Sequence, residues 1–248
     1  MKEEDRQRTI RLKLARQEIR QRPVIPTGFS SLDGALGVGG LPRGRILELF
    51  GPPSCGKTTL ALQIAARLQR KGATAAWVDA EHVFDPAYGA ALGVAIERMP
   101  IVEPDSAEQA LEIAHTLAVS GAVDLLVIDS AAALVPRLEL EAGLGESGPG
   151  LQSRVLASGL RRLSLAVAKT ATCVMFLNQL RTRMGPAGED SETSAGGAPL
   201  KLYAAVRIVL CQGTGGRVLF RMLKNKAAGA FSDGELVWVP GSGFAETP

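Results

Sequence analysis

The stretch from Gly51 to Thr58, GPPSCGKT, constrains this chain more than any other part of its sequence. A glycine, four further residues and then Gly-Lys-Thr form the pattern of a phosphate-binding loop. In such a loop, backbone N–H groups surround phosphate oxygens, the lysine neutralises their charge and the threonine hydroxyl ligates Mg²⁺. The predicted site for a nucleoside triphosphate consists of Gly51, Pro52, Pro53, Ser54, Cys55, Gly56, Lys57, Thr58 and Thr59.

The residues on both sides of this loop have the periodicity that the pattern requires. Before it, residues 45–50 form a short apolar run of strand length. After it, Leu60, Ile64 and Leu68 recur at helical spacing, and Gly72 is a suitable helix stop. An ordinary loop with a chance Gly-Lys-Thr lacks this context, so we expect a strand, a glycine loop and a helix in that order.

Further along, segments with strand character alternate with segments of helical character. This alternation predicts an α/β fold, with a mainly parallel, twisted sheet covered by helices on both faces. Towards the end, two strand-like runs joined by Gly-Thr-Gly-Gly predict an antiparallel hairpin. The predicted strands are 73–79, 123–130 and 171–179, the predicted helices are 106–121 and 151–170, and the hairpin lies within 206–226.

Composition excludes several classes of protein. Of the 248 residues, 46% are hydrophobic and 21% are charged, which suits one sizeable core, and no apolar run is long enough to span a bilayer. The three cysteines, Cys55, Cys173 and Cys211, are widely spaced and odd in number, so neither a disulfide framework nor a zinc site is expected. A reducing, cytoplasmic location follows. Cys55 lies in the phosphate loop, where it is either inert or oxidisable.

The first 22 residues differ from the rest in charge. They contain eight Lys or Arg against four Asp or Glu, and Ile10, Leu14 and Ile19 have helical spacing before Pro23. We therefore divide the chain into a basic helical arm, 1–23, and a core, 24–248. The arm docks on a neighbouring subunit, binds nucleic acid, or is simply a solvated helical face.

Polar residues at the predicted strand ends carry the chemistry, because ligands of open α/β sheets bind beyond the carboxyl ends of the strands. Asp129 ends an apolar run and can hold the Mg²⁺ that Thr58 ligates, unless it caps the next helix. Glu81 follows a strand and can deprotonate the water that attacks the γ-phosphate. Gln179 ends another strand and can sense that phosphate. Singly, Glu81 and Gln179 are equally compatible with surface polar residues.

Together these stretches resemble a known family. The segments TGFSSLD, GGLPRGRILELFGPPSCGKTTL, VDAEHVFDPAY, SGAVDLLVIDSAAALVP, FLNQLR and LKNKAAGAF are similar, in order and nearly in spacing, to the ATPase core of bacterial RecA recombinases. The resemblance covers about residues 24–240 and implies a RecA-like P-loop NTPase fold. It also implies that the nucleotide is ATP.

The resemblance assigns roles to single residues. It implies that Glu81 is the catalytic base, that Asp85 and Tyr88 border the adenine, and that Gln179 couples ATP to DNA; Tyr88 also suits a packed helix residue. It implies that Lys224 and Lys226 reach the ATP of the adjacent subunit. The implied catalytic set is Glu81, Lys57, Gln179, Lys224 and Lys226. Such a shared site requires subunits that associate head to tail, in a filament or a ring.

Two glycine-rich loops, 139–154 and 180–197, match the DNA-binding loops of the family. The resemblance therefore implies single-stranded DNA as a partner. The residues that match its DNA contacts are Arg154, Arg161, Arg181, Arg183, Gly196 and Gly197. Each arginine on its own is better explained as a solvated surface charge.

The sequence departs from the family at several of these positions. The second loop contains two arginines against three carboxylates, and 186–190 lacks a bulky apolar residue in its middle. Gly148 and Pro149 stand where the family usually has His-Met, and Leu202 replaces an aromatic residue. These differences weaken the prediction of DNA binding.

Two functions from different classes remain open. The first is an ATP-dependent DNA-binding enzyme of repair and homologous recombination, a DNA-dependent ATPase assembled on single strands. The alternative is an accessory protein resembling the ImuA group of damage-induced mutagenesis, which binds translesion or other repair proteins. The intact ATP-site residues favour the enzyme. The expected absence of the family's amino-terminal strand and linker, and of its carboxy-terminal domain beyond about Phe244, favours the accessory protein. A small-molecule kinase is disfavoured because no lid for a second substrate is recognisable.

Overall fold

The computed structural model describes residues 23–142, 148, 150–184, 190–229 and 231–246. Within these residues, ten strands join in one main sheet, in the order β12-β11-β10-β9-β3-β7-β6-β4-β5, with β8 paired to β7. From β9 through β3, β7, β6 and β4 to β5, adjacent strands pair in parallel. The pairs from β9 to β12, and the pair of β7 with β8, are antiparallel. The mainly parallel α/β sheet predicted from the sequence is therefore confirmed.

The parallel strands are β3 (Ile46–Gly51), β4 (Ala75–Asp79), β5 (Ile101–Val102), β6 (Leu125–Asp129), β7 (Cys173–Met184) and β9 (Val206–Gln212). The antiparallel strands that follow are β10 (Arg217–Asn225), β11 (Asp233–Val239) and β12 (Gly243–Ala245). A separate small ribbon pairs β1 (Val24–Ile25) with β2 (Leu41–Pro42). Strands β9 and β10 form the predicted hairpin.

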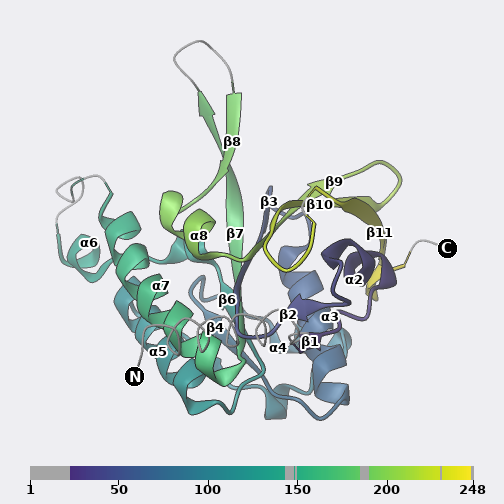
Figure 1. Cartoon of the computed structure of the whole chain (residues 1–248), viewed down its shortest axis with the longest axis horizontal. Coiled ribbons are helices and arrows are strands. Elements are labelled where there is room, and N and C mark those ends of the chain that lie inside the picture. The colour runs from purple at the N-terminus through teal and green to yellow at the C-terminus, as the bar shows by residue number, and fades with distance from the viewer. Residues whose placement is uncertain (1–22, 143–147, 149, 185–189, 230, 247–248) are drawn as a thin grey trace, which may run out of the picture.

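Helices cover both faces of the sheet, and alternate side chains of β6 pack against helices on opposite faces. Leu125 and Val127 join a core with α3 (Lys57–Arg70), whereas Leu126 and Ile128 join a second core with α5 (Ala107–Ser120) and α7 (Leu151–Thr170). Successive strand residues point to opposite faces, so a strand buried on both faces must be apolar throughout. Figure 1 shows α5 and α7 side by side on one flank of the sheet and α3 on the other.

The helix ends follow the sequence signals. The hydroxyl of Ser106 accepts a hydrogen bond from the Gln109 amide at the start of α5, and Gly121 ends that helix with a left-handed backbone. The shorter helices are α2 (Ser30–Leu36), α4 (Pro86–Ala91), α6 (Arg137–Glu141), α8 (Ala198–Tyr203) and the 3-10 turns Ile96–Arg98 and Ala131–Ala133. Among the described helices, none combines the length and hydropathy needed to cross a bilayer.

One feature was not predicted from the sequence. Strand β7 continues past Gln179 to Met184 and pairs with β8 (Asp190–Ser194), so that this hairpin projects beyond the body of the molecule (Figure 1). Its tip, and part of the first loop that matches a DNA-binding loop, lie outside the described residues. So do residues 1–22, and the predicted helical arm therefore stays a prediction.

Candidate functional site

The phosphate loop connects β3 to α3, as predicted, and two of its glycines are required by close contacts. Gly56 has φ of 90°, and a Cβ built on it would lie 2.3 Å from Cζ of Phe244. A Cβ on Gly51 would lie 2.4 Å from the carbonyl oxygen of Leu210. Any other residue at either position would force the loop away from its neighbours.

The side chain of Lys57 curls over this loop. Its Nζ donates hydrogen bonds to the carbonyl oxygens of Pro52, at 2.7 Å, and Gly51, at 3.3 Å. Cys55 is buried in the loop, and its Sγ lies 3.8 Å from the same Nζ. Burial raises the pKa of the Cys55 thiol, against the opposing effect of Lys57. A thiol held in its protonated form is a poor nucleophile, which favours the inert interpretation of this residue.

Thr58 and Asp129 meet at the carboxyl end of the sheet. The Thr58 hydroxyl donates a hydrogen bond of 2.9 Å to Oδ2 of Asp129. Burial, with the nearby charges of Glu81 and Asp79, raises the pKa of Asp129 from 3.8 to about 6, and the hydrogen bond from Thr58 opposes this rise. A hydroxyl and a carboxylate oxygen are ligands that suit Mg²⁺, which is usually bound by one or two protein groups together with substrate phosphates. Among the described residues, no group of three or more His, Cys, Asp or Glu could hold a metal ion.

Glu81 is held beside Asp129 by backbone and side-chain contacts. The amides of Ala80 and Glu81 donate to the carbonyl oxygen of Asp129, at 2.7 and 3.2 Å, and Ser130 Oγ donates to Glu81 Oε1. The Asp129–Ser130 peptide bond is cis. Thus the structure brings together Thr58, Asp129 and Glu81, which the sequence placed at three separate strand or loop ends.

Gln179 lies beside the phosphate loop, on the neighbouring strand β7. It is the register partner of Gly51 in the parallel pairing of β3 with β7. Its carbonyl oxygen accepts a hydrogen bond of 3.0 Å from the amide of Ala195, at the end of the second glycine-rich loop. Gln179 therefore stands between the first residue of the phosphate loop and that second loop.

Asp85 and Tyr88 lie on the other side of the loop. Asp85 caps α4, because its carboxylate accepts from the amides of Ala87 and Tyr88 at 2.8 and 3.1 Å. The Tyr88 hydroxyl lies 2.7 Å from Oγ1 of Thr59. The structure thus places both residues near the loop, with the Asp85 carboxylate engaged by its helix.

A pocket of about 480 Å³ opens beside the loop. Besides residues 54–59, its walls include Arg217, Trp238 and Phe244, which sequence reasoning missed. The two aromatic rings pack edge to face with centroids 5.4 Å apart. A strand from the far end of the chain closes this wall, so no local pattern could have indicated it. Aromatic residues make up only 4% of the sequence, so the presence of Trp238 and Phe244 was the only signal that could have drawn attention to this wall.

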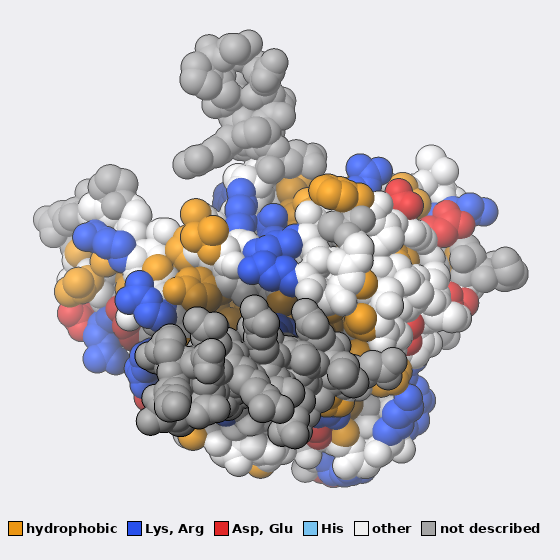
Figure 2. Space-filling view, in the orientation of Figure 1, with side chains coloured by type: hydrophobic (Ala, Val, Ile, Leu, Met, Phe, Trp, Pro, Cys, Tyr) orange, Lys and Arg blue, Asp and Glu red, His pale blue; other side chains and the backbone are white. Residues whose placement is uncertain are grey.

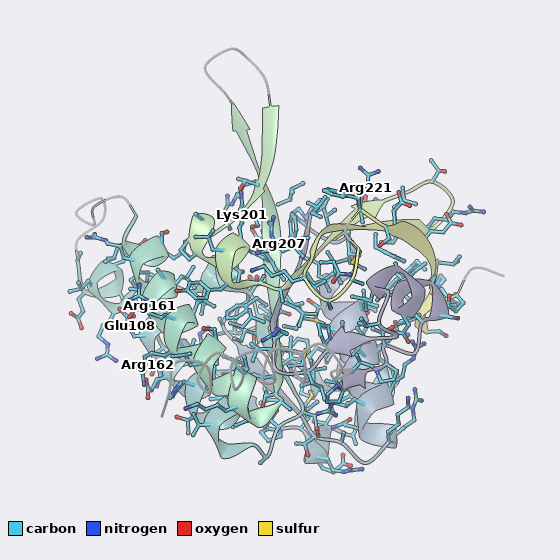
Figure 3. All side chains as sticks on the ribbon, in the orientation of Figure 1. Glu108, Arg161, Arg162, Lys201, Arg207 and Arg221 are labelled. Carbon is cyan, nitrogen blue, oxygen red and sulfur yellow. The ribbon has the colours of Figure 1, made fainter. Side chains whose placement is uncertain are left out.

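Lys224 and Lys226 are absent from the described lining of that pocket. The Lys224 ammonium donates to the carbonyl oxygens of Lys201, at 2.5 Å, and Leu202, at 3.1 Å, while Lys226 is exposed. Partial burial lowers the pKa of Lys224, and the charges of Lys226 and Arg207 lower it further. Figure 2 shows Lys and Arg side chains gathered below the β7–β8 hairpin. Figure 3 labels Lys201 and Arg207 in the same area.

Two of the predicted DNA contacts lie on α7. Arg154 and Arg161 are exposed and seven residues apart, so they share one face of the helix. Arg162, the next residue, instead forms an exposed ion pair of 2.8 Å with Glu112 of α5. Figure 3 shows Arg161 and Arg162 along this helix.

The glycines of the second loop lie against the start of α7. A Cβ on Gly196 would lie 2.8 Å from Cδ1 of Leu156, and one on Gly197 would lie 3.0 Å from Oγ of Ser153. Both glycines have positive φ, 81° and 79°. Arg181 is exposed at the base of the β7–β8 hairpin. Arg183 lies in β7 opposite Ser191, and its side chain is outside the described part of the chain.

The parallel sheet, the phosphate loop at the end of β3 and the carboxylates beyond β4 and β6 define the core of a P-loop ATPase. A family model described as the RecA N-terminal domain matches residues 3–244. The chain belongs to the RecA family, whose members are ATP-binding, DNA-dependent ATPases of DNA repair and recombination.

Similar proteins from three bacteria support this assignment, and each is named Protein RecA. That of Desulforapulum autotrophicum is 45% identical over 245 residues, which make up 95% of this chain and 71% of the relative. That of Herpetosiphon aurantiacus is 50% identical over 220 residues, 85% and 62% of the two chains. That of Thermus thermophilus is 47% identical over 235 residues, 91% and 69%. The chain therefore spans roughly two thirds of the length of these relatives, and nothing in the comparisons favours the accessory-protein alternative.

Proposed function

We propose that this protein hydrolyses ATP at the contact between two copies of the chain, in response to single-stranded DNA. The observation that carries the proposal is the division of charged groups in one protomer. The phosphate loop, Thr58, Asp129 and Glu81 form one half of a catalytic site. The Lys224 ammonium instead donates to the carbonyl oxygens of Lys201 and Leu202, and Lys226 is exposed, so both cations are free to face a neighbouring copy.

In the ATP-bearing half, Lys57 neutralises the phosphates, and the loop amides bind their oxygens. Thr58 and Asp129 would hold Mg²⁺, which would neutralise charge at the phosphates. Glu81 accepts the proton of the attacking water, and the Ser130 hydroxyl orients its carboxylate through their hydrogen bond. Asp85 and Tyr88 flank the adenine of ATP.

In the neighbouring half, Lys224 and Lys226 supply positive charge to the transferring phosphate. Such cations stabilise the charge that develops in the transition state, and they act only once the two subunits are in contact. A head-to-tail contact uses two different surfaces of each copy and so continues from one copy to the next. ATP is then hydrolysed only where two copies of the chain have assembled.

The DNA partner binds along the face of α7 and the glycines of the second loop. Arg154 and Arg161 are spaced to contact phosphates of one strand, and Arg181 lies at the base of the projecting hairpin. Arg183 belongs to the same loop by its position in the sequence. Backbone amides at Gly196 and Gly197 can approach a strand closely because neither residue has a side chain. The basic arm, 1–23, adds either a subunit contact or a nucleic-acid contact.

ATP turnover measured with and without single-stranded DNA tests this proposal. We expect DNA to increase turnover by about tenfold or more, because assembly on the strand completes each site. The Lys57→Ala variant is the control and should show no turnover in either condition. Turnover that is equal with and without DNA over a range of protein concentrations would contradict the proposed function.

A further inference from the structure

Glu48 is a fully buried carboxylate to which the ATP site gives no role. It lies in the middle of β3, three residues before the phosphate loop begins at Gly51. The residues on either side, Leu47 and Leu49, are buried and apolar. A charge in such a place is tolerated only when it is paired and hydrogen-bonded. The groups that pair with the Glu48 carboxylate therefore indicate its role.

The carboxylate of Glu48 joins the two strands that flank β3. Its Oε2 accepts a hydrogen bond of 2.5 Å from Nε of Arg207, on β9. Its Oε1 accepts one of 2.8 Å from Nδ2 of Asn178, on β7. The Arg207 guanidinium also lies over the ring of Phe50, 4.7 Å from its centroid. Three strands at the base of the phosphate loop are thus held by one side chain.

The same partners reach both stems of the second glycine-rich loop. Arg207 Nη2 donates to Oγ of Ser194 at 3.2 Å, and Asn178 Nδ2 donates to the carbonyl oxygen of Ala195 at 3.0 Å. The Asn178 side-chain oxygen accepts from the amide of Gln179 at 2.8 Å. Gln179 in turn accepts from the Ala195 amide. The network therefore holds the start and the end of that loop together.

We propose that Glu48, Asn178, Arg207 and Ser194 form a positioning network that couples the phosphate loop to the second DNA-binding loop. None of the four is assigned a contact with nucleotide or DNA; they act by fixing Gln179 and Ala195 relative to Gly51. Their charges and hydrogen bonds satisfy Glu48 in this one arrangement, so a displacement of β3 would carry the loop stems with it. The inference rests on the proposed function, because it assumes that Gln179 senses the phosphate.

Two variants test the network. Ser194→Ala removes only the link from Arg207 to the loop, and Glu48→Gln removes the charge while keeping the shape of the side chain. The control is Asp124→Asn, which weakens the 2.5 Å ion pair between Arg43 and Asp124 at the opposite ends of the strands. Both pairs join an arginine to a carboxylate, although Glu48 is fully buried and Asp124 is 29% exposed, so the control shows whether loss of such a pair elsewhere in the sheet also changes the DNA response.

Three quantities are measured for each full-length variant: the Kd for ATP, the ratio of turnover with and without single-stranded DNA, and hydrogen exchange of the amides at 193–197. We expect Ser194→Ala and Glu48→Gln to keep the Kd within about twofold of the wild type and to lower the DNA-dependent ratio by about five- to tenfold. The Asp124→Asn variant should keep that ratio. In the wild type, ATP should change exchange at 193–197, and this change should be lost in the two network variants.

The exchange measurement separates failure of this inference from failure of the proposed function. If the wild type shows no DNA stimulation but ATP changes exchange at 193–197 only when the network is intact, the DNA-dependent function is wrong and the network stands. If DNA stimulates the wild type and both network variants equally, the network is overturned while the function stands. An equal loss of the ratio in Asp124→Asn also overturns it, since the effect is then one of stability.

Discussion

Thr58 and Asp129 are joined by a hydrogen bond of 2.9 Å between Oγ1 and Oδ2. Thr58 is the second residue of α3 and Asp129 is the last residue of β6, so this bond fixes the helix start to the strand end. It brings a hydroxyl and a carboxylate oxygen close enough to ligate one cation. This is the position at which we propose that Mg²⁺ binds, and the Asp129 carboxyl would make that binding depend on pH.

The affinity for Mg²⁺ in the presence of ATP is expected to fall in acid. The pKa of Asp129 is raised to about 6, so the carboxyl is protonated below that pH, and a proton there competes with the metal. Below pH 6 the affinity should fall about tenfold for each pH unit. A magnesium titration of the ATP complex by calorimetry checks this, with Asp129→Asn as a control that binds weakly at every pH. Equal affinity at acidic and neutral pH would refute the assignment.

In acid, the raised pKa of Asp129 weakens Mg²⁺ binding, but it stabilises the folded state of the nucleotide-free protein. The folded state holds the Asp129 proton more tightly than the unfolded state, because the pKa is raised from 3.8 to about 6. Its contribution to the free energy of unfolding is full below pH 3.8 and is lost as the pH rises through about 6. Mg²⁺ and ATP should therefore stabilise the wild type most above pH 6.

Glu81→Gln should retain ATP binding and lose turnover. The amide cannot accept a proton from water, and loss of a general base lowers rates by about a hundredfold or more. Ser130→Ala leaves the carboxylate in place but removes its hydrogen bond, so a smaller loss, about threefold to tenfold, is expected. Single-turnover kinetics at saturating ATP distinguish the two. If Glu81→Gln turned over at the wild-type rate, Glu81 would not be the base.

Arg154 and Arg161 should each contribute to the salt dependence of DNA binding. Replacing either with alanine should flatten the slope of log K against log salt by about 0.7 for single strands, since one phosphate contact is lost. Arg162→Ala is the matched control, because Arg162 is paired with Glu112 instead. Fluorescence anisotropy with a labelled oligonucleotide at several salt concentrations measures the slopes. An unchanged slope in Arg154→Ala and Arg161→Ala would remove α7 from the DNA interface.

Much of the fold follows from local signals in the sequence. The phosphate-loop spacing, the Ser106 cap and the apolar run of β6 predicted a strand, a helix and another strand in the right places, because each depends on residues that are neighbours in the chain. The meeting of Thr58 with Asp129 also followed, since carboxyl ends of parallel strands share an edge.

The unpredicted parts depend on residues far apart in the sequence. The extension of β7 to Met184 requires pairing with β8, whose polar sequence gives no strand signal by itself. Phe244 closes the pocket beside the phosphate loop through its close approach to Gly56, and nothing near either residue in the sequence indicates this. Glu48 lies inside an apolar run, and its partner Arg207 is 159 positions further along the chain. A lone acidic residue in a buried strand was the one signal that could have found it.

Lys57→Ala and Lys224→Ala should separate binding from turnover. The first variant removes the cation that neutralises the phosphates, so ATP binding should be abolished. The second leaves the phosphate loop of its own protomer intact, so the Kd for ATP should stay within about twofold while turnover is lost. Equilibrium binding of a fluorescent ATP analogue, with turnover measured in parallel, tests both. Equal loss of binding in the two variants would contradict the separation.

Mixing two inactive variants tests the shared site most directly. One carries Lys57→Ala and supplies intact Lys224 and Lys226; the other carries Lys224→Ala and Lys226→Ala and supplies an intact phosphate loop. In an equal mixture assembled at random on single-stranded DNA, about a quarter of the contacts pair the two intact halves, and turnover should rise to about that fraction of the wild-type rate. If the mixture is no more active than its separate components, the site is not shared between protomers.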